Sequence, residues 1–172
     1  MMMNFRTAAA IGMLAVSGAY AQQTGYMKAK VEPGRAGVFV DGKYVGPAAN
    51  FGAGRKYALP PGEHKIKLSE PRYEDLETSV TVQPGKTVEL KQTMKALAPA
   101  KGPFGTLRTK SPDKYAAVYI NDHFMGHAGE FNNPWQVLKL PAGEYNVRIE
   151  PANGQPVRQK VKIEVDKTVI VK

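Results

Sequence analysis

The chain repeats its own sequence after 80 to 81 residues, and this duplication limits its possible folds more than any other feature. Val38–Gly42 (VFVDG) returns as Val118–Asp122 (VYIND), and Leu59–His64 (LPPGEH) returns as Leu140–Tyr145 (LPAGEY). Hydrophobic residues and turn formers make up most of what returns. Such self-similarity predicts two copies of one small domain, so a candidate site in one copy has to be compared with the same positions in the other.

The first 21 residues have the three parts of a secretory signal peptide. Arg6 supplies the basic n-region, residues 7–17 form a short apolar stretch, and Ala19–Ala21 is an A-x-A cleavage motif. The apolar stretch is too short for a membrane span, which needs about 20 residues. We therefore expect cleavage after Ala21 and secretion, with the periplasm as destination, of a mature chain without a transmembrane segment. An uncleaved N-terminal anchor is the alternative.

The mature chain is basic and contains no cysteine. The full sequence has a net charge of +9, and loss of Arg6, the one charged residue of the signal peptide, leaves +8. Domains of about 70 residues lie near the lower limit of stability. Without disulfides, these domains must depend on apolar packing, including contact between the two copies. A basic surface also favours anionic partners.

Hydrophobic residues alternate with polar ones in short runs through both copies, and no segment has the periodicity of an amphipathic helix. This pattern predicts short strands with one buried face. Asp41-Gly42 is typical of a type I′ hairpin turn, and Asn121-Asp122 can adopt the same turn at a greater conformational cost. About seven strands per copy predict an all-β fold of two small tandem β-sandwiches with an immunoglobulin-like architecture.

Residues 95–103 lack a strand pattern and contain two prolines, one glycine and three alanines. We expect this segment to be a semi-stiff linker. It would join a first domain, residues 22–94, to a second domain, residues 104–172.

Four features of the first copy occur together: the turn Pro33–Ala36 (PGRA), the hairpin Val38–Gly42, Gly46 and the strand entry Leu59–His64. In this combination the copy resembles a PEGA domain, a small all-β module of bacterial and archaeal surface and envelope proteins. The second copy is more diverged, because Pro112–Ala116 contains an extra residue. The resemblance implies a non-catalytic extracytoplasmic module, and it supplies neither a common ligand nor functional residues.

Aromatic side chains that face away from the predicted core form one candidate binding surface. These are Phe39, Tyr44, Tyr119, Phe124 and Trp135. Flat rings bury apolar area, while Tyr and Trp keep a polar group, which suits sugar rings or a protein partner. The alternative is that these residues cover a second sheet or the contact between the domains, with Trp135 packed between the copies.

Lysines that alternate with core residues form the other candidate surface. These are Lys28, Lys30, Lys65 and Lys67. They could bind an anionic envelope polymer, phospholipid headgroups or nucleic acid, with an affinity that falls steeply with salt; export disfavours nucleic acid. The alternative is ordinary solvent-facing alternation, in which lysines also protect exposed sheet edges.

Two sets of residues have the composition of a catalytic site. Asp122, His123 and His127 are ligand types for zinc, although two loop histidines are the simpler interpretation. Carboxylates gather at Glu70, Glu74, Asp75 and Glu77, where a glycosidase pair is conceivable and a solvated acidic loop is favoured. No serine lies in a G-x-S-x-G motif.

The sequence therefore predicts a non-catalytic module, with no cofactor or metal, that associates with an anionic or glycan component of the cell envelope. A second hypothesis is a protein scaffold, in which a sheet edge or the Trp135 region docks an envelope protein. A third is a small metal-dependent enzyme built on Asp122, His123 and His127.

Overall fold

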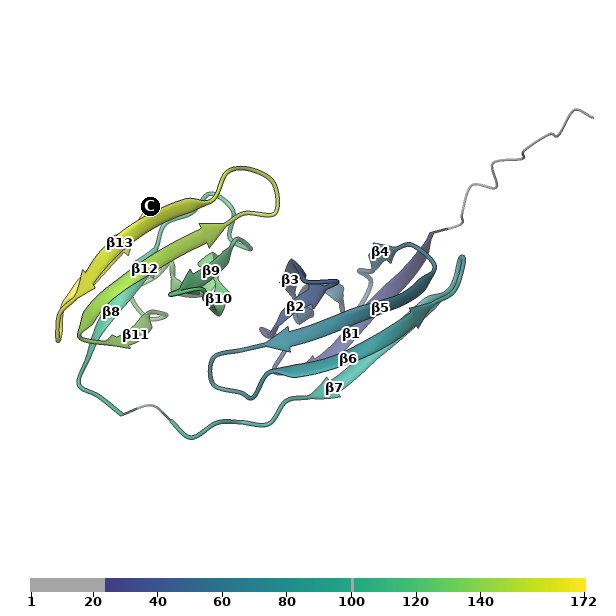
Figure 1. Cartoon of the computed structure of the whole chain (residues 1–172), viewed down its shortest axis with the longest axis horizontal. Coiled ribbons are helices and arrows are strands. Elements are labelled where there is room, and N and C mark those ends of the chain that lie inside the picture. The colour runs from purple at the N-terminus through teal and green to yellow at the C-terminus, as the bar shows by residue number, and fades with distance from the viewer. Residues whose placement is uncertain (1–23, 100) are drawn as a thin grey trace, which may run out of the picture.

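The computed structural model describes residues 24–99 and 101–172. The predicted signal peptide, residues 1–21, lies outside the described residues. The fold is all-β, as predicted, and consists of two halves with the same order of elements (Figure 1). None of the helices in the described residues is long and apolar enough to span a bilayer.

Seven strands and one short 3₁₀ helix form each half. The first half contains β1 (Gly25–Glu32), β2 (Gly37–Val40), β3 (Lys43–Pro47), η1 (Ala48–Phe51), β4 (Tyr57–Leu59), β5 (Gly62–Ser69), β6 (Leu76–Val82) and β7 (Thr87–Thr93). The second half contains β8 (Phe104–Thr109), β9 (Ala117–Ile120), β10 (His123–His127), η2 (Ala128–Phe131), β11 (Leu138–Pro141), β12 (Gly143–Glu150), β13 (Val157–Ile163) and β14 (Thr168–Val171).

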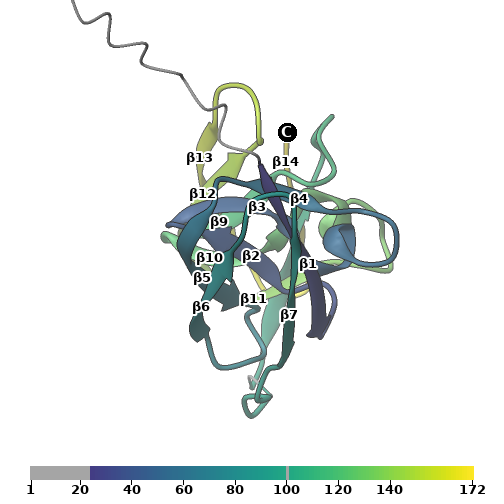
Figure 2. The same ribbon diagram turned by 90° about the vertical axis from the view of Figure 1, so that its right-hand side faces the viewer.

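Each half is a sandwich of a three-stranded and a four-stranded sheet. The strand orders are β4-β1-β7 and β3-β2-β5-β6 in the first half, and β11-β8-β14 and β10-β9-β12-β13 in the second. The first and last strands of each half pair in parallel, and the other pairs are antiparallel. In Figure 2, β5 and β6 lie on one side of the first half and β1 and β7 on the other.

A separate hydrophobic core fills each sandwich, because alternate side chains of both sheets point inward. Met27, Ile66 and Leu68 are fully buried in the first core, and Leu107 and Ile163 in the second. The period-two pattern of the sequence is therefore the pattern of burial in both halves.

The predicted type I′ turns occur in both halves. All four central residues have positive φ: Asp41 (50°), Gly42 (81°), Asn121 (48°) and Asp122 (64°). In each half, the side chain of the first of them accepts a hydrogen bond from the next strand, Asp41 Oδ1 from Lys65 N and Asn121 Oδ1 from Asn146 N, both at 2.9 Å. Because Asp and Asn both have an Oδ1 acceptor, either residue can make this bond.

The turn before β2 also keeps its hydrogen bonds in the second half. Ala36 N donates to Pro33 O at 3.0 Å, and Ala116 N donates to Asp113 O at 3.2 Å. Both alanines are fully buried. The extra residue of the second copy therefore precedes the turn and does not alter it.

Candidate functional site

Four of the five candidate aromatic residues lie between the two halves. Phe124 contacts the rings of Phe39 and Tyr44, each with a centroid distance of 5.3 Å, and that of Tyr119 at 5.8 Å. Tyr119 and Phe124 are buried, and burial also raises the pKa of Tyr44. The rings largely cover one another, although Phe39 and Tyr44 stay partly exposed. Their position corresponds to the domain–domain contact that the sequence left as an alternative.

The contact uses equivalent positions of the two copies. Phe39 and Tyr119 lie on β2 and β9, while Tyr44 and Phe124 lie on the adjacent edge strands β3 and β10. A Cβ atom on Gly37 would be 2.5 Å from the Phe124 ring, so the absence of a side chain there lets the ring approach the backbone. The halves therefore meet through the same edge of each four-stranded sheet.

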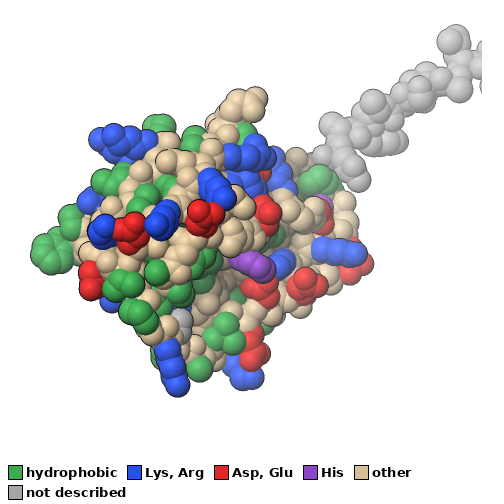
Figure 3. Space-filling model, turned by 60° about the vertical axis from the view of Figure 1, so that its left-hand side comes forward, with side chains coloured by type: hydrophobic (Ala, Val, Ile, Leu, Met, Phe, Trp, Pro, Cys, Tyr) green, Lys and Arg blue, Asp and Glu red, His purple; other side chains and the backbone are tan. Residues whose placement is uncertain are grey.

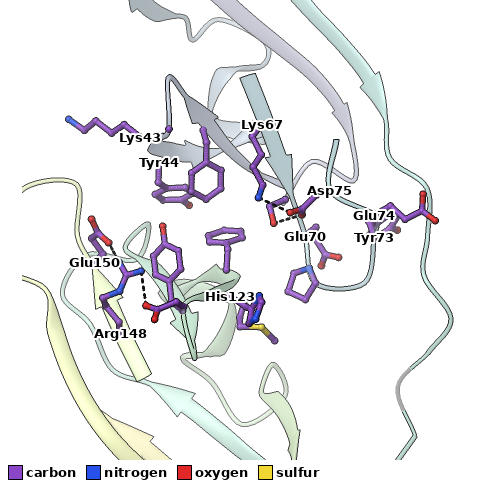
Figure 4. Close-up of a pocket in the computed structure, with 18 of the residues that line it drawn as sticks. Lys43, Tyr44, Lys67, Glu70, Tyr73, Glu74, Asp75, His123, Arg148 and Glu150 are labelled. Atoms are coloured by element: carbon purple, nitrogen blue, oxygen red, sulfur yellow. Dashed lines mark hydrogen bonds and ion pairs between the residues drawn. The ribbon is translucent and has the colours of Figure 1, made fainter. Parts of the chain in front are cut away.

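A groove of about 1160 Å³ runs beside this aromatic contact and is lined by both halves (Figure 4). Acidic side chains outnumber Lys and Arg in its lining, and two of these cations are paired. Lys67 Nζ lies 2.8 Å from Asp75 Oδ2, and Arg148 pairs with Glu150 and stacks 3.8 Å from the Tyr119 ring centroid. Figure 4 shows these two cations on opposite sides of the ring cluster. Each ion pair lies within a single half, beside the aromatic contact.

The acidic segment after β5 is mostly exposed, as expected of a solvated loop, except at Glu70. Glu70 is only 3% exposed, and its carboxylate lies 3.2 Å from Arg35 Nε and also contacts the Arg72 guanidinium. Glu74 pairs with Lys95 at 2.8 Å. These carboxylates have structural partners, and their arrangement gives no support to a glycosidase pair.

The structure does not bring together the three residues considered for zinc. Among residues 24–99 and 101–172, no group of three or more His, Cys, Asp or Glu side chains could hold a metal ion. Asp122 and His123 are exposed at the hairpin, whereas His127 is half-buried with Nδ1 3.5 Å from Glu130 Oε2. His123 and His127 are the first and last residues of β10, and residues four apart along an extended strand do not converge as they do on a helix.

The four candidate lysines do not form one patch. Lys28 and Lys30 lie on β1, on the outer face of the three-stranded sheet, whereas Lys65 and Lys67 lie on β5, on the outer face of the other sheet. The core of the sandwich separates the two pairs. Figure 3 shows basic and acidic side chains interspersed over the face in view, without a single basic area.

Trp135 is the candidate that remains free, with 92% of its surface exposed. It does not pack between the copies, as one alternative supposed. Its turn is nevertheless fixed, because Asn133 Oδ1 accepts hydrogen bonds from Trp135 N and Gln136 N, both at 2.9 Å. Arg108 Nη2 on β8 donates to Asn132 O at 2.8 Å and attaches this turn to the sheet. Sequence reasoning did not single out Arg108, since one outward cation in a strand is not a signal.

Comparison with known proteins gives the family. The PEGA domain matches the chain twice, over residues 28–97 and 104–172. A solved structure, "The Bacillus anthracis TIE protein", is similar over 87% of this chain at 17% identity with a TM-score of 0.33. The chain spans 34% of that protein's length. The comparison with curated proteins gave no match.

PEGA domains are non-catalytic modules of extracellular and surface proteins. The two matches together cover most of the sequence, and each includes one of the two sandwiches. The chain therefore belongs to the PEGA domain family, as a tandem of two PEGA domains.

Proposed function

We propose that this protein is a non-catalytic extracytoplasmic module that binds a glycan component of the cell envelope through Trp135. The proposal includes export by the signal peptide 1–21, with cleavage after Ala21 and release into the periplasm. The observation that carries it is a tryptophan 92% exposed on a turn that Asn133 fixes by hydrogen bonds.

An exposed tryptophan is a binding feature when its position is fixed. A tryptophan ring buries about 150–250 Å² when it is covered, and it keeps an N–H for hydrogen bonding. Because the turn of Trp135 is already ordered, binding loses little conformational entropy there. The flat face of the ring complements the C–H face of a sugar, and the amides of Asn132 and Gln136 beside it are suited to sugar hydroxyls.

The packing of the two domains also favours a binding module. The aromatic rings at their contact hold the halves as one unit. Such a unit presents Trp135 in a defined direction, while the other candidate aromatics are occupied in holding the domains together.

A protein partner is the second candidate, because tryptophan is equally suited to the centre of a protein interface. The two candidates differ in the ligand that would cover the ring. Binding to a glycan would occur without any other protein, whereas a scaffold would need a second protein from the envelope.

The chain contains one tryptophan, so its fluorescence reports on this site alone. We expect isolated envelope polysaccharide, free of protein, to shift the Trp135 emission to shorter wavelength and to protect it from acrylamide quenching. The Tyr57→Phe variant, altered in the other half, should respond as the unaltered protein does. If polysaccharide leaves emission and quenching unchanged and an envelope protein fraction shifts the emission, the ligand of Trp135 is a protein and not a glycan.

A further inference from the structure

We propose that the glycan bound at Trp135 is acidic, and that Arg108 holds its carboxylate or phosphate group. This inference rests on the function proposed above and names the ligand class of the same site. It follows from a difference between the two domains at equivalent positions of the parallel strand pair.

In the first domain, the outward cation of the first strand has an acidic neighbour. Lys28 on β1 lies opposite Glu89 on β7 in the parallel register. The equivalent pair in the second domain is Arg108 on β8 and Ile170 on β14. The acid is therefore replaced by an isoleucine that is 46% exposed, and no carboxylate lies opposite the cation in this register.

Arg108 has no carboxylate partner among residues 24–99 and 101–172. In this it resembles Arg55 and Arg158, whereas the other three described arginines each form an ion pair with an acidic side chain. The only hydrogen bond of the Arg108 guanidinium is to Asn132 O at 2.8 Å, and its buried Nε has no acceptor in the described part of the chain. A partly desolvated guanidinium without a counter-ion favours an oxyanion from outside.

The surrounding sheet adds no negative charge. None of the strands β8, β11 and β14 contains Asp or Glu, and Lys139 lies on the outer face of β11. Thr106 and Thr168 add hydroxyl groups to this face, with their Oγ1 atoms 2.6 Å apart. The face therefore offers cations and hydroxyls, with no acidic side chain on its three strands.

Arg108 is attached to the turn that carries Trp135. Arg108 binds the carbonyl of Asn132, three residues before Trp135 in the same fixed turn. A sugar ring can stack on the indole while the guanidinium receives an oxyanion in its planar fork. A neutral sugar would use only the first of these two contacts.

Two matched pairs of probes test the charge requirement, with Trp135 fluorescence as the readout. They are oligogalacturonate with its methyl ester, and phosphomannan with mannan, so that carboxylate and phosphate are examined separately. We expect at least tenfold tighter binding of the charged member in one or both pairs, with a preference that weakens as salt is added. Equal affinity for charged and neutral members of both pairs would overturn this inference and leave the glycan function standing.

Two substitutions locate the charge recognition. Arg108→Gln should abolish the preference for the charged probe. Ile170→Glu, which places at β14 the acid found at the equivalent position of β7, should do the same while Arg108 and its bond to the turn remain. Lys28→Gln in the first domain is the matched control and should keep the preference.

The remaining outcomes also test the inference. A preference that survives both Arg108→Gln and Ile170→Glu would assign charge recognition elsewhere and overturn the inference. No response of Trp135 to any of the four probes would overturn it too, and the titration with envelope polysaccharide then decides separately whether the glycan function stands.

Discussion

The imidazole of His64 makes two hydrogen bonds that protonation favours. Its Nδ1 lies 2.7 Å from Asp41 Oδ2, and its Nε2 lies 2.9 Å from Pro60 O. Because both partners are acceptors, only the protonated ring can donate to both of them at once. The hydrogen bond to Asp41, followed by that to Pro60, raises the pKa of His64. Tyr145 occupies the equivalent position in the second domain and reaches Pro141 O at 3.0 Å without a titratable partner.

Because of this difference, we expect His64 to make the stability of the protein depend on pH. Since the folded pKa of His64 is raised above its ordinary value of 6.5, its stabilising contribution is complete below pH 6.5 and is lost as pH rises through the folded pKa. His64→Tyr introduces the residue of the other domain, and it should remove this loss of stability on the alkaline side. Urea unfolding of both proteins from pH 5.5 to 8.5 measures it.

His127 is a second titrating group that is present in both proteins of this comparison. Burial lowers the pKa of His127, so its contribution changes with pH in the opposite direction. The difference between the unaltered protein and the His64→Tyr variant isolates His64. Parallel pH profiles for the two proteins would contradict the assignment.

At the scale of elements, the two β-hairpins provide a reciprocal experiment on turn chemistry. Asp122 has a φ of 64°, in the left-handed region that costs a side chain free energy, whereas Gly42 fills the equivalent position at a φ of 81°. Asp122→Gly should raise the free energy of unfolding by about 0.5 to 1 kcal/mol, and Gly42→Asp should lower it by about the same amount. Urea midpoints with a common m-value measure both changes.

The ion pair that Asp122→Gly removes does not change this expectation. Asp122 Oδ1 is 3.5 Å from Arg148 Nη2, and its side chain is 90% exposed, so the pair contributes little. Changes of the same sign in the two variants would show that backbone conformation does not determine how these turns contribute to the free energy of unfolding.

Turns and strands could be predicted from the sequence because their chemistry is local and occurs twice. The positive φ of Asp41-Gly42 and of Asn121-Asp122 follows from residue type alone. The parallel pairing of first and last strands in each domain is different, since it joins residues far apart in the chain. The missing counter-ion of Arg108 depends on Ile170, 62 residues later, and no local pattern contains that information.

At the scale of the whole molecule, the arrangement of the two domains depends on the fit of Phe124 over Gly37. Gly37→Ala would place a methyl group 2.5 Å from the ring and force the ring away from its position in the contact. We expect a loss of about 1 to 3 kcal/mol, as for other overpacked sites. The radius of gyration in small-angle X-ray scattering should increase as the halves separate.

Gly34→Ala is the matched control for this experiment. Its Cβ would meet no atom closer than 3.5 Å, so the radius of gyration should stay unchanged. An unchanged radius in the Gly37→Ala variant would contradict the aromatic contact as the element that holds the domains together.

The sequence could identify the outward aromatics but not which of them stay free. Phe39, Tyr44, Tyr119 and Phe124 share the outward pattern with Trp135, and only the way in which β3 meets β10 separates the four covered rings from the exposed one. Orientation between domains depends on the summed fit of two surfaces, which residue types alone do not reveal.

Co-sedimentation with purified envelope polysaccharide tests the central claim most directly. The unaltered protein and Leu97→Ala, which changes an exposed hydrophobic residue of the first half, should both sediment with the polysaccharide, whereas Trp135→Ala should remain in the supernatant. Sedimentation of the Trp135→Ala variant to the same extent as the unaltered protein would contradict the account.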